Sequence, residues 1–259
     1  MKRLKLFNIF TLFNLSFGQE CHSDTDTCSE IVCPKITEMT TCIDQSLNGY
    51  STYQLSVLIN DDNIKNIYAI YGDDENGLHE LTIPPAYQSG IINNNLGGIA
   101  ENIQSIIPRT KIDSWMTIGI TNGDKYNQLG SVGIDFNNWD QNNGIMTTNG
   151  AVYVTDPQEI LSNTNEYIIS QLTLNNNDDH LMIVNLQGHY INEELGLGRI
   201  WDFKSLRFKI FSKNNDDCSL WFDGCNICEK NNGIISQCTD LTCQEQRESY
   251  CISSDVSGH

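Results

Sequence analysis

Hydrophobic and polar positions alternate along the central part of the chain. In residues 53–59, one face carries Tyr53, Leu55, Val57 and Ile59. This period of two predicts a half-buried β-strand. Further segments rich in β-branched and aromatic residues bring the prediction to about nine strands. The predicted strands are residues 53–59, 67–71, 78–83, 115–121, 131–136, 151–155, 167–174, 181–190 and 206–211.

Turn residues support a β-rich fold. Asn-Gly pairs stand at 48–49, 76–77, 122–123, 143–144 and 149–150. Asn followed by Gly accepts the positive φ angles of a tight hairpin turn. The three pairs within residues 122–150 predict consecutive hairpins.

Helical periodicity is sparse. Residues 97–107 space Ile99, Ile103, Ile106 and Ile107 as one helical face, and Pro108 ends the pattern. A second short helix is predicted near residues 157–161. Many short strands with few helices predict a mainly β protein, an antiparallel β-sandwich.

The N-terminus has the features of a signal peptide. Lys2, Arg3 and Lys5 precede an apolar run at residues 6–17, and Ser16 and Gly18 form a small-x-small cleavage pattern. We expect cleavage after Gly18 and secretion. No later run reaches the length that crosses a bilayer, so no transmembrane anchor is expected in the mature chain.

The ten cysteines form two groups. An even number in a secreted chain indicates disulfides, and we expect each cysteine to pair within its own group. The N-terminal group, for which no single pairing is favoured, is Cys21, Cys28, Cys33 and Cys42. The C-terminal group is Cys218, Cys225, Cys228, Cys238, Cys243 and Cys251.

Cysteine placement also divides the chain. The stretch between Cys42 and Cys218 contains none, so its core must be hydrophobic. The predicted division is a signal peptide at 1–18, a cysteine-rich N-terminal arm at 19–46, the β-sandwich domain at 47–213 and a cysteine-rich module at 214–259. We also expect residues 47–213 to fold without the two ends.

The two cysteine-rich ends share a six-residue pattern. Residues 28–33 and 238–243 both read Cys, hydroxyl, acid, aliphatic, β-branched, Cys. This agreement predicts that the arm is a partial copy of the C-terminal module.

The C-terminal module resembles the pacifastin family of small serine-protease inhibitors. The resemblance is carried by the run Cys225-Asn226-Ile227-Cys228, by Gly233, and by Cys238-Thr239 with Cys243. It implies the disulfides Cys225–Cys243 and Cys228–Cys238, which leaves Cys218 for Cys251. It also implies that Asp240, followed by Leu241, would enter a protease pocket. Asp240 has the wrong charge for a trypsin-like pocket. The sequence departs from the family at Lys230, where a cysteine is expected.

Two further resemblances concern secreted proteins. Residues 221–228, Trp-Phe-Asp-Gly-Cys-Asn-Ile-Cys, look like a module of secreted marine protist proteins. The strings at 113–119, 133–136, 149–151 and 156–158 resemble an uncharacterised β-rich region of secreted proteins from microalgae and bacteria. These resemblances imply location and fold class, not chemistry.

The net charge of −18 argues against nucleic acid as a partner and allows cations. No cofactor is expected other than calcium, because acidic and amide side chains cluster in several loops. No cluster fits an EF-hand. The calcium-site candidates are Asp135, Asn137, Asn138 and Asp140.

No G-x-S-x-G, H-E-x-x-H or D-T-G motif occurs, and no catalytic residue is predicted. Trp139 lies in a polar stretch and is the candidate for an exposed face that stacks on a sugar ring. We therefore expect a secreted, non-catalytic protein, a surface or matrix component or a ligand-binding module, whose partner is an extracellular protein or glycan. The alternatives are a serine-protease inhibitor that uses residues 238–243 and, third, a carbohydrate-active enzyme with a carboxylate pair.

Overall fold

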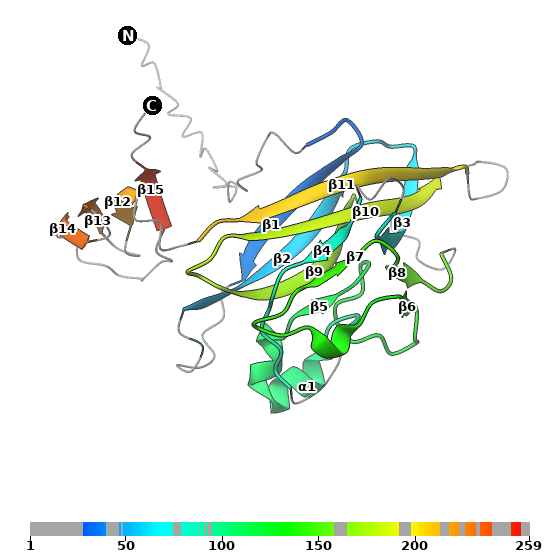
Figure 1. The fold of residues 1–259 in the computed structure, drawn as a ribbon, viewed down its shortest axis with the longest axis horizontal. Helices are drawn as coiled ribbons and strands as arrows, with labels where there is room; N and C mark the ends of the chain where they lie inside the picture. Colours follow the sequence, from blue (N-terminus) through cyan, green and yellow to red (C-terminus); the bar gives the residue numbers. More distant parts are fainter. Residues whose placement is uncertain are drawn as a thin grey trace, which may run out of the picture.

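Antiparallel strands make up most of the structure, as the alternating pattern predicted (Figure 1). The computed structural model describes residues 28–39, 47, 49–74, 79–90, 92, 95–157, 165–191, 198–212, 218–222, 226–231, 234–239 and 250–254. The fold is mainly β, with two larger sheets and a small disulfide-bonded sheet near the C-terminus. The signal peptide and the second predicted helix, at 157–161, fall almost entirely outside these residues.

The first sheet has four strands in the order β1-β2-β9-β5. These are β1 (Val32–Met39), β2 (Tyr50–Ile59), β9 (Glu166–Asn175) and β5 (Trp115–Met116). The predicted strand at 115–121 is therefore only two residues long. Beyond it the chain still follows β9, since the amides of Thr117 and Gly119 donate to the carbonyls of Ile169 and Ile168.

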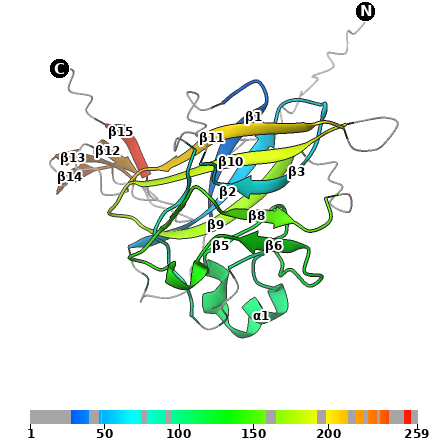
Figure 2. The ribbon, with the colours of Figure 1, turned by 45° about the vertical axis from the view of Figure 1, so that its right-hand side comes forward.

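The second sheet has seven strands and curls into part of a barrel (Figure 2). Its order is β6-β8-β3-β10-β4-β7, and β11 pairs with the other side of β10. The strands are β3 (Ile64–Tyr71), β4 (Leu81–Ile83), β6 (Leu129–Val132), β7 (Ile145–Thr147), β8 (Ala151–Val154), β10 (His180–Tyr190) and β11 (Ile200–Ile210).

One hydrophobic core joins the two sheets. It takes inward-facing residues from both, among them Leu55 and Leu172 of the first sheet and Ile70, Val184 and Phe208 of the second. All five are at most 1% exposed. Burial of one such side chain stabilises the fold by about 1.5–3 kcal/mol.

The expectation of consecutive hairpins in residues 122–150 is wrong. β7 pairs with β4, whereas β8 pairs with β6 and β3, so neighbours in sequence lie in different parts of the sheet. Gly123 has the positive φ that the turn pattern implied, but its amide donates to the carbonyl of Gly97. The Asn-Gly pair there ties two loops together instead of closing a hairpin.

The predicted helix is present as α1 (Glu101–Ile106), followed at once by a 3₁₀ turn at Pro108–Ile112. Its expected apolar face is not buried. Ile99, which precedes the helix, is 1% exposed, but Ile106 is 79% exposed. None of the six residues of the helix is buried.

The N-terminal arm contributes a strand that the sequence analysis did not expect. β1 pairs with β2 over eight residues, from Val32 opposite Ile59 to Met39 opposite Thr52. Val32 is fully buried in the core, and Lys35 forms an ion pair with Glu166 across two strands (3.0 Å). Residues 32–39 are therefore part of the first sheet.

The C-terminal module is a four-stranded sheet of order β14-β13-β12-β15. Its strands are β12 (Cys218–Phe222), β13 (Ile227–Asn231), β14 (Ile234–Cys238) and β15 (Tyr250–Ser254). The disulfide Cys228–Cys238 joins β13 to β14, as the pacifastin resemblance implied. Cys218 is also disulfide-bonded.

The arm and the module do not use their shared pattern in the same way. Cys28 bonds to Cys33 within the pattern, whereas the matching Cys238 bonds to Cys228 outside it. The shared sequence pattern therefore does not lead to a shared disulfide pairing. Both described bonds stay within their own cysteine group, as expected. Cys21, Cys42, Cys225 and Cys243 lie outside the described residues, and the side chain of Cys251 is not described, so the implied pairs Cys225–Cys243 and Cys218–Cys251 stay predictions.

Candidate functional site

The outer face of the seven-stranded sheet carries a cluster of aromatic and polar side chains. We call it the tyrosine face and define it by Tyr68, Tyr71, Tyr153, Gln187, His189, Asp202 and Lys204 with its partner Asp73. These residues come from β3, β8, β10, β11 and the turn after β3. Residues directly opposite one another on neighbouring strands point to the same side of a sheet, so the strand register brings them together.

One ladder of opposed residues crosses the face. Gly130 on β6 lies opposite Tyr153 on β8, and Tyr153 lies opposite Ala69 on β3. Ala69 in turn lies opposite Gln187 on β10, which lies opposite Asp202 on β11. Neighbouring strands are about 4.8 Å apart, so the ladder from Tyr153 to Asp202 spans about 14 Å.

Tyr153 is the most exposed ring of the face, at 36%. A Cβ atom on Gly130 would stand only 2.6 Å from Tyr153 Cζ and 2.8 Å from its Oη. The far end of the ring therefore occupies the space that a side chain at position 130 would need. Glycine at 130 lets the ring lie down on β6 while it remains open to solvent.

Tyr68 lies at an irregularity in the pairing of β3 with β10. Gln187 pairs with Ala69 and Gly188 with Ile67, so Tyr68 is the extra residue of a bulge beside Gln187. The Tyr68 hydroxyl donates to Gln187 Oε1 (2.8 Å), and its ring packs on His189 with centroids 4.6 Å apart. Burial, together with nearby Tyr71, raises the pKa of Tyr68, so its hydroxyl remains a hydrogen-bond donor.

Tyr71 anchors the charged part of the face. The Lys204 ammonium lies 4.6 Å from the Tyr71 ring centre and forms a short ion pair with Asp73. Burial disfavours the charged form of Lys204, but the hydrogen bond to Asp73 and the contact with Tyr71 outweigh it and raise the pKa of Lys204. Lys204 and Asp73 thus neutralise each other.

A bulge in β11 holds Lys204 in place. The β10–β11 register shifts between Val184 and Leu186, and Ser205 has a positive φ of 58°. Asn185 fixes this shape: its Oδ1 accepts from the Ser205 amide (2.8 Å), and its Nδ2 donates to the carbonyls of Tyr71 and His79. A buried amide with three partners of good geometry stabilises an otherwise strained backbone.

The same bulge brings a serine and a histidine together. Ser205 Oγ lies 3.0 Å from His79 Nδ1, although the residues are 126 positions apart. Such a pair can move a proton from a hydroxyl to an imidazole. Here the Ser205 amide is already bound by Asn185, and the pair forms part of the support for the bulge.

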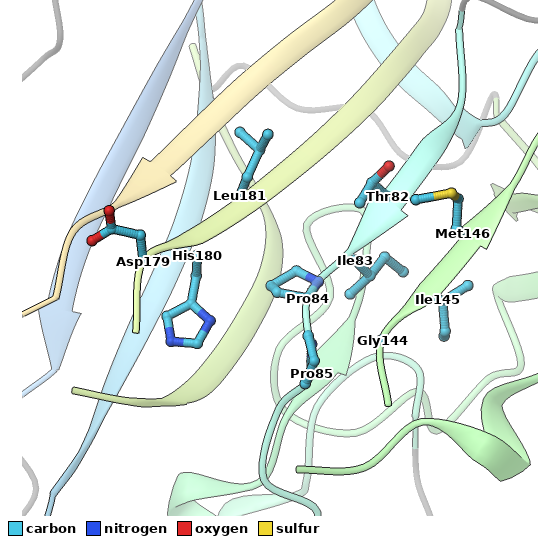
Figure 3. Close-up of a pocket in the computed structure, with 10 residues that line it drawn as sticks. All are labelled: Thr82, Ile83, Pro84, Pro85, Gly144, Ile145, Met146, Asp179, His180 and Leu181. Carbon is cyan, nitrogen blue, oxygen red and sulfur yellow. The ribbon is translucent and has the colours of Figure 1, made fainter. Parts of the chain in front are cut away.

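A second feature is a notch of about 370 Å³ between the end of β4 and the start of β10 (Figure 3). Pro84 and Pro85 follow β4 directly and have no amide hydrogens, so the ladder with β10 ends after the one pairing of Thr82 with Ile183. The notch is lined mainly by apolar residues, and Figure 3 shows the His180 ring across the gap from the two prolines. His180 Nε2 donates to the carbonyl of Asn175 (2.8 Å).

The prediction that Trp139 forms an exposed stacking face is wrong. Trp139 is 2% exposed, belongs to the core and packs near Phe136. Its Nε1 donates to the carbonyl of Pro84 (2.9 Å). The polar residues around it are exposed, whereas the indole is part of the core.

The candidate calcium loop uses its carboxylates to close two turns. Asp135 accepts from the Asn137 amide and from Asn138 Nδ2. Asp140 accepts from the Asn142 amide and from two donors of Asn143, and these bonds hold its pKa below the usual range. A calcium ion would have to displace these hydrogen bonds. Within the described ranges, no three His, Cys, Asp or Glu side chains gather as a metal site.

Asp113 is a buried acid between the 3₁₀ turn at Pro108–Ile112 and β5. It is 2% exposed, and its Oδ1 accepts from the Ser89 amide (2.6 Å). Burial raises the pKa of Asp113 to about 6, against the opposing effect of the Ser89 hydrogen bonds. The neighbouring carbonyl of Asp113 accepts from Gln171 Nε2 of β9 (2.8 Å). Asp113 therefore joins the loop at 86–90 to the edge of the first sheet.

The loop that the pacifastin resemblance assigns to inhibition is described only up to Thr239. The Thr239 hydroxyl accepts from the Ile227 amide (3.0 Å) and donates to Asn226 Oδ1 (3.2 Å). With the adjacent Cys228–Cys238 bond, these contacts fix the residue before the predicted reactive position. Asp240 and Leu241 themselves lie outside the described residues.

No helix among the described residues is long and apolar enough to cross a membrane. Comparison with protein-family models, with curated proteins and with solved structures finds no match to this chain. The site must therefore be interpreted from its own geometry.

Proposed function

We propose that this chain is a secreted, non-catalytic binding protein that recognises glycan through the tyrosine face. The observation that carries the proposal is the Tyr153 ring, which is held over Gly130 and remains 36% exposed beside a row of hydrogen-bonding side chains. The apolar face of a sugar ring stacks on such an aromatic ring. Gln187, Tyr68 and Asp202 then supply donors and acceptors for hydroxyl groups.

The support for the face favours a binding role. Tyr68, Tyr71 and Lys204 are each held by a second side chain, namely Gln187, Lys204 and Asp73. Side chains that are fixed before the ligand arrives lose little conformational entropy on binding. The Asn185 bonds at the Ser205 bulge extend this order to the backbone. The disulfides in both end regions agree with an extracellular location.

Retardation in polyacrylamide gels that contain neutral polysaccharides tests the proposal. The panel should include β-1,3-glucan, β-1,4-glucan, mannan and xylan. Tyr153→Ala should weaken binding to the retarding polymer about tenfold, since loss of one stacking contact costs about 1.4 kcal/mol. Gly130→Val should weaken it similarly while retaining the tyrosine, because the new side chain would lift the ring.

The matched control is Phe211→Ala. Phe211 is 61% exposed and follows β11 at the end away from the tyrosine face. This change should leave retardation unaltered. Thermal melts must show that all three variants remain folded. Equal retardation of wild type and Tyr153→Ala by every polymer that binds would refute the proposal.

Protease inhibition by the C-terminal module is the second candidate function. The contacts of Thr239 with Asn226 and Ile227 favour it, because an inhibitor loop needs a rigid approach to its reactive position. The natural Asp240 opposes binding to trypsin-like pockets. We expect no trypsin inhibition by the natural protein and inhibition after Asp240→Arg if the loop has an inhibitory shape. Nanomolar inhibition of trypsin or chymotrypsin by the natural protein would make this the primary function.

A further inference from the structure

The register of the second sheet indicates how a glycan would lie on it. The ladder Gly130, Tyr153, Ala69, Gln187 and Asp202 crosses five strands at right angles. Tyr153 stands near one end of the ladder and Asp202 at the other, and Ala69 is the small residue between Tyr153 and Gln187. A ligand that touches both Tyr153 and Asp202 must be about 14 Å long and must run across the strands.

The ladder ends at the two edges of the sheet. β6 and β11 each pair with one described strand only, β8 and β10 respectively. The face is thus a surface that continues to both edges, unlike the notch, which is a cavity between β4 and β10. Among the described strands, none pairs beyond β6 or β11, so the sheet itself sets no end to a polymer on the face.

The charges of the face select against acidic ligands. The ammonium group that belongs to the face, on Lys204, is already paired with Asp73, and Lys65 of β3 lies near His189 at the other side of the face. Asp202 adds an exposed carboxylate at the end of the ladder, in a chain whose net charge is −18. A carboxylate or sulfate on the ligand near Asp202 would therefore meet like charge.

Resting on the proposed function, we infer that the tyrosine face binds an internal stretch of a neutral, extended polysaccharide, about three sugar units long and lying across β8, β3, β10 and β11. A hexose unit of an extended chain spans about 5 Å, close to the spacing of neighbouring strands. Tyr153 stacks on the first unit, Gln187 and Tyr68 bond to the central part, and Asp202 accepts from hydroxyl groups at the far end.

Calorimetric titration with a length series from the retarding polymer tests this inference. Affinity should rise at least tenfold from the disaccharide to the trisaccharide or tetrasaccharide, and should then change less than twofold up to the hexasaccharide. Reduction of the sugar end to an alditol in the hexasaccharide should leave affinity unchanged within twofold. A carboxymethylated form of the polymer should bind at least tenfold more weakly.

Two variants test where the bound polysaccharide lies along the ladder. Asp202→Ala should remove the affinity gain of the longest recognised unit and leave the disaccharide unaffected. Tyr153→Ala should weaken every length. The control for Asp202→Ala is Arg207→Ala. Arg207 is another exposed charged residue of β11, beyond the bulge, and its loss should change neither the affinity for the disaccharide nor the gain with chain length.

The outcomes separate this inference from the proposed function. If a polymer binds through Tyr153 but the monosaccharide binds as tightly as the tetrasaccharide, or the alditol loses affinity, the face recognises a single unit or a chain end and the inference is overturned. Tighter binding of the acidic polymer would overturn the charge argument. If no polymer is retarded, both the inference and the proposed function fail.

Discussion

Asp113 gives a quantitative prediction of how stability depends on pH. The substitution Asp113→Asn keeps an oxygen that can accept from the Ser89 amide but removes the ionisable group. In the folded protein, burial raises the pKa of Asp113 from 3.8 to about 6. A raised carboxyl pKa means that folding favours the protonated form. The contribution to stability is therefore fully present below pH 3.8 and is lost as pH rises through about 6.

The difference between the two pKa values corresponds to about 3 kcal/mol of unfolding free energy, most of it lost between pH 4 and pH 8. The Asp113→Asn variant has no ionisable group at position 113, so its unfolding free energy does not fall in this way. The unfolding free energy of the variant, minus that of the wild type, should therefore be about 2.4 kcal/mol larger at pH 8 than at pH 4. Taking the difference at each pH removes the repulsion of the other acidic groups, which both proteins share.

Urea unfolding at several pH values between 4 and 8 measures this difference. Asp113→Ala is the matched control, since it removes the charge and the hydrogen-bond acceptor together. It should show the same pH trend but lie about 1–3 kcal/mol lower at every pH, because the Ser89 amide loses its partner. A difference between Asp113→Asn and wild type that stays constant from pH 4 to pH 8 would refute the reasoning.

Three further outcomes are expected. A fragment of residues 47–213 should give β-rich circular dichroism, but a fragment of residues 28–213 should have an unfolding free energy at least about 2 kcal/mol higher, because β1 covers the edge of β2 and buries Val32. Equal urea midpoints for the two fragments would contradict this role of β1. In thermal melts, Ser205→Gly should be about 1 kcal/mol more stable than Ser205→Ala, because both variants lose the His79 contact but only glycine accepts the positive φ without strain. The reverse order of stability would exclude backbone strain at the bulge. Trp139→Phe should lower the unfolding free energy by about 1–3 kcal/mol through loss of the bond to Pro84, and an unchanged value would show that this bond is replaced by water.

Most strands could be predicted because their information is local. Alternation in residues 53–59 reports directly which side of β2 faces the core, and the structure buries Tyr53, Leu55 and Val57 as expected. The strand β1 was missed because its segment contains Pro34 and has no clear alternation. Pairing with β2 along its whole length, rather than its own pattern, makes it a strand. Interaction with a distant segment can override weak local preference.

The tyrosine face could not be predicted from sequence because it depends on register. Tyr68 and Tyr153 are 85 positions apart, and only the pairings of β3 with β8 and β10 bring them to one surface. The bulge beside Gln187 adds Tyr68 to that surface, and sequence alternation would have placed it on the other side. The error on Trp139 has the same origin. Its neighbours in sequence are polar, but its neighbour in space is the carbonyl of Pro84.

The bulge at Ser205 also bears on how copies of this protein behave beside one another at high concentration. Among the described strands, β11 pairs only with β10 and is a long edge strand, and the unpaired backbone groups of an edge strand can recruit a strand from another molecule. The register break interrupts that row of groups, and Asp202, Arg207 and Lys209 place charges of both signs along the remainder. An incoming strand would have to match the bulge and bury these charges. The device that holds Lys204 in the tyrosine face therefore also protects the chain against edge-to-edge aggregation.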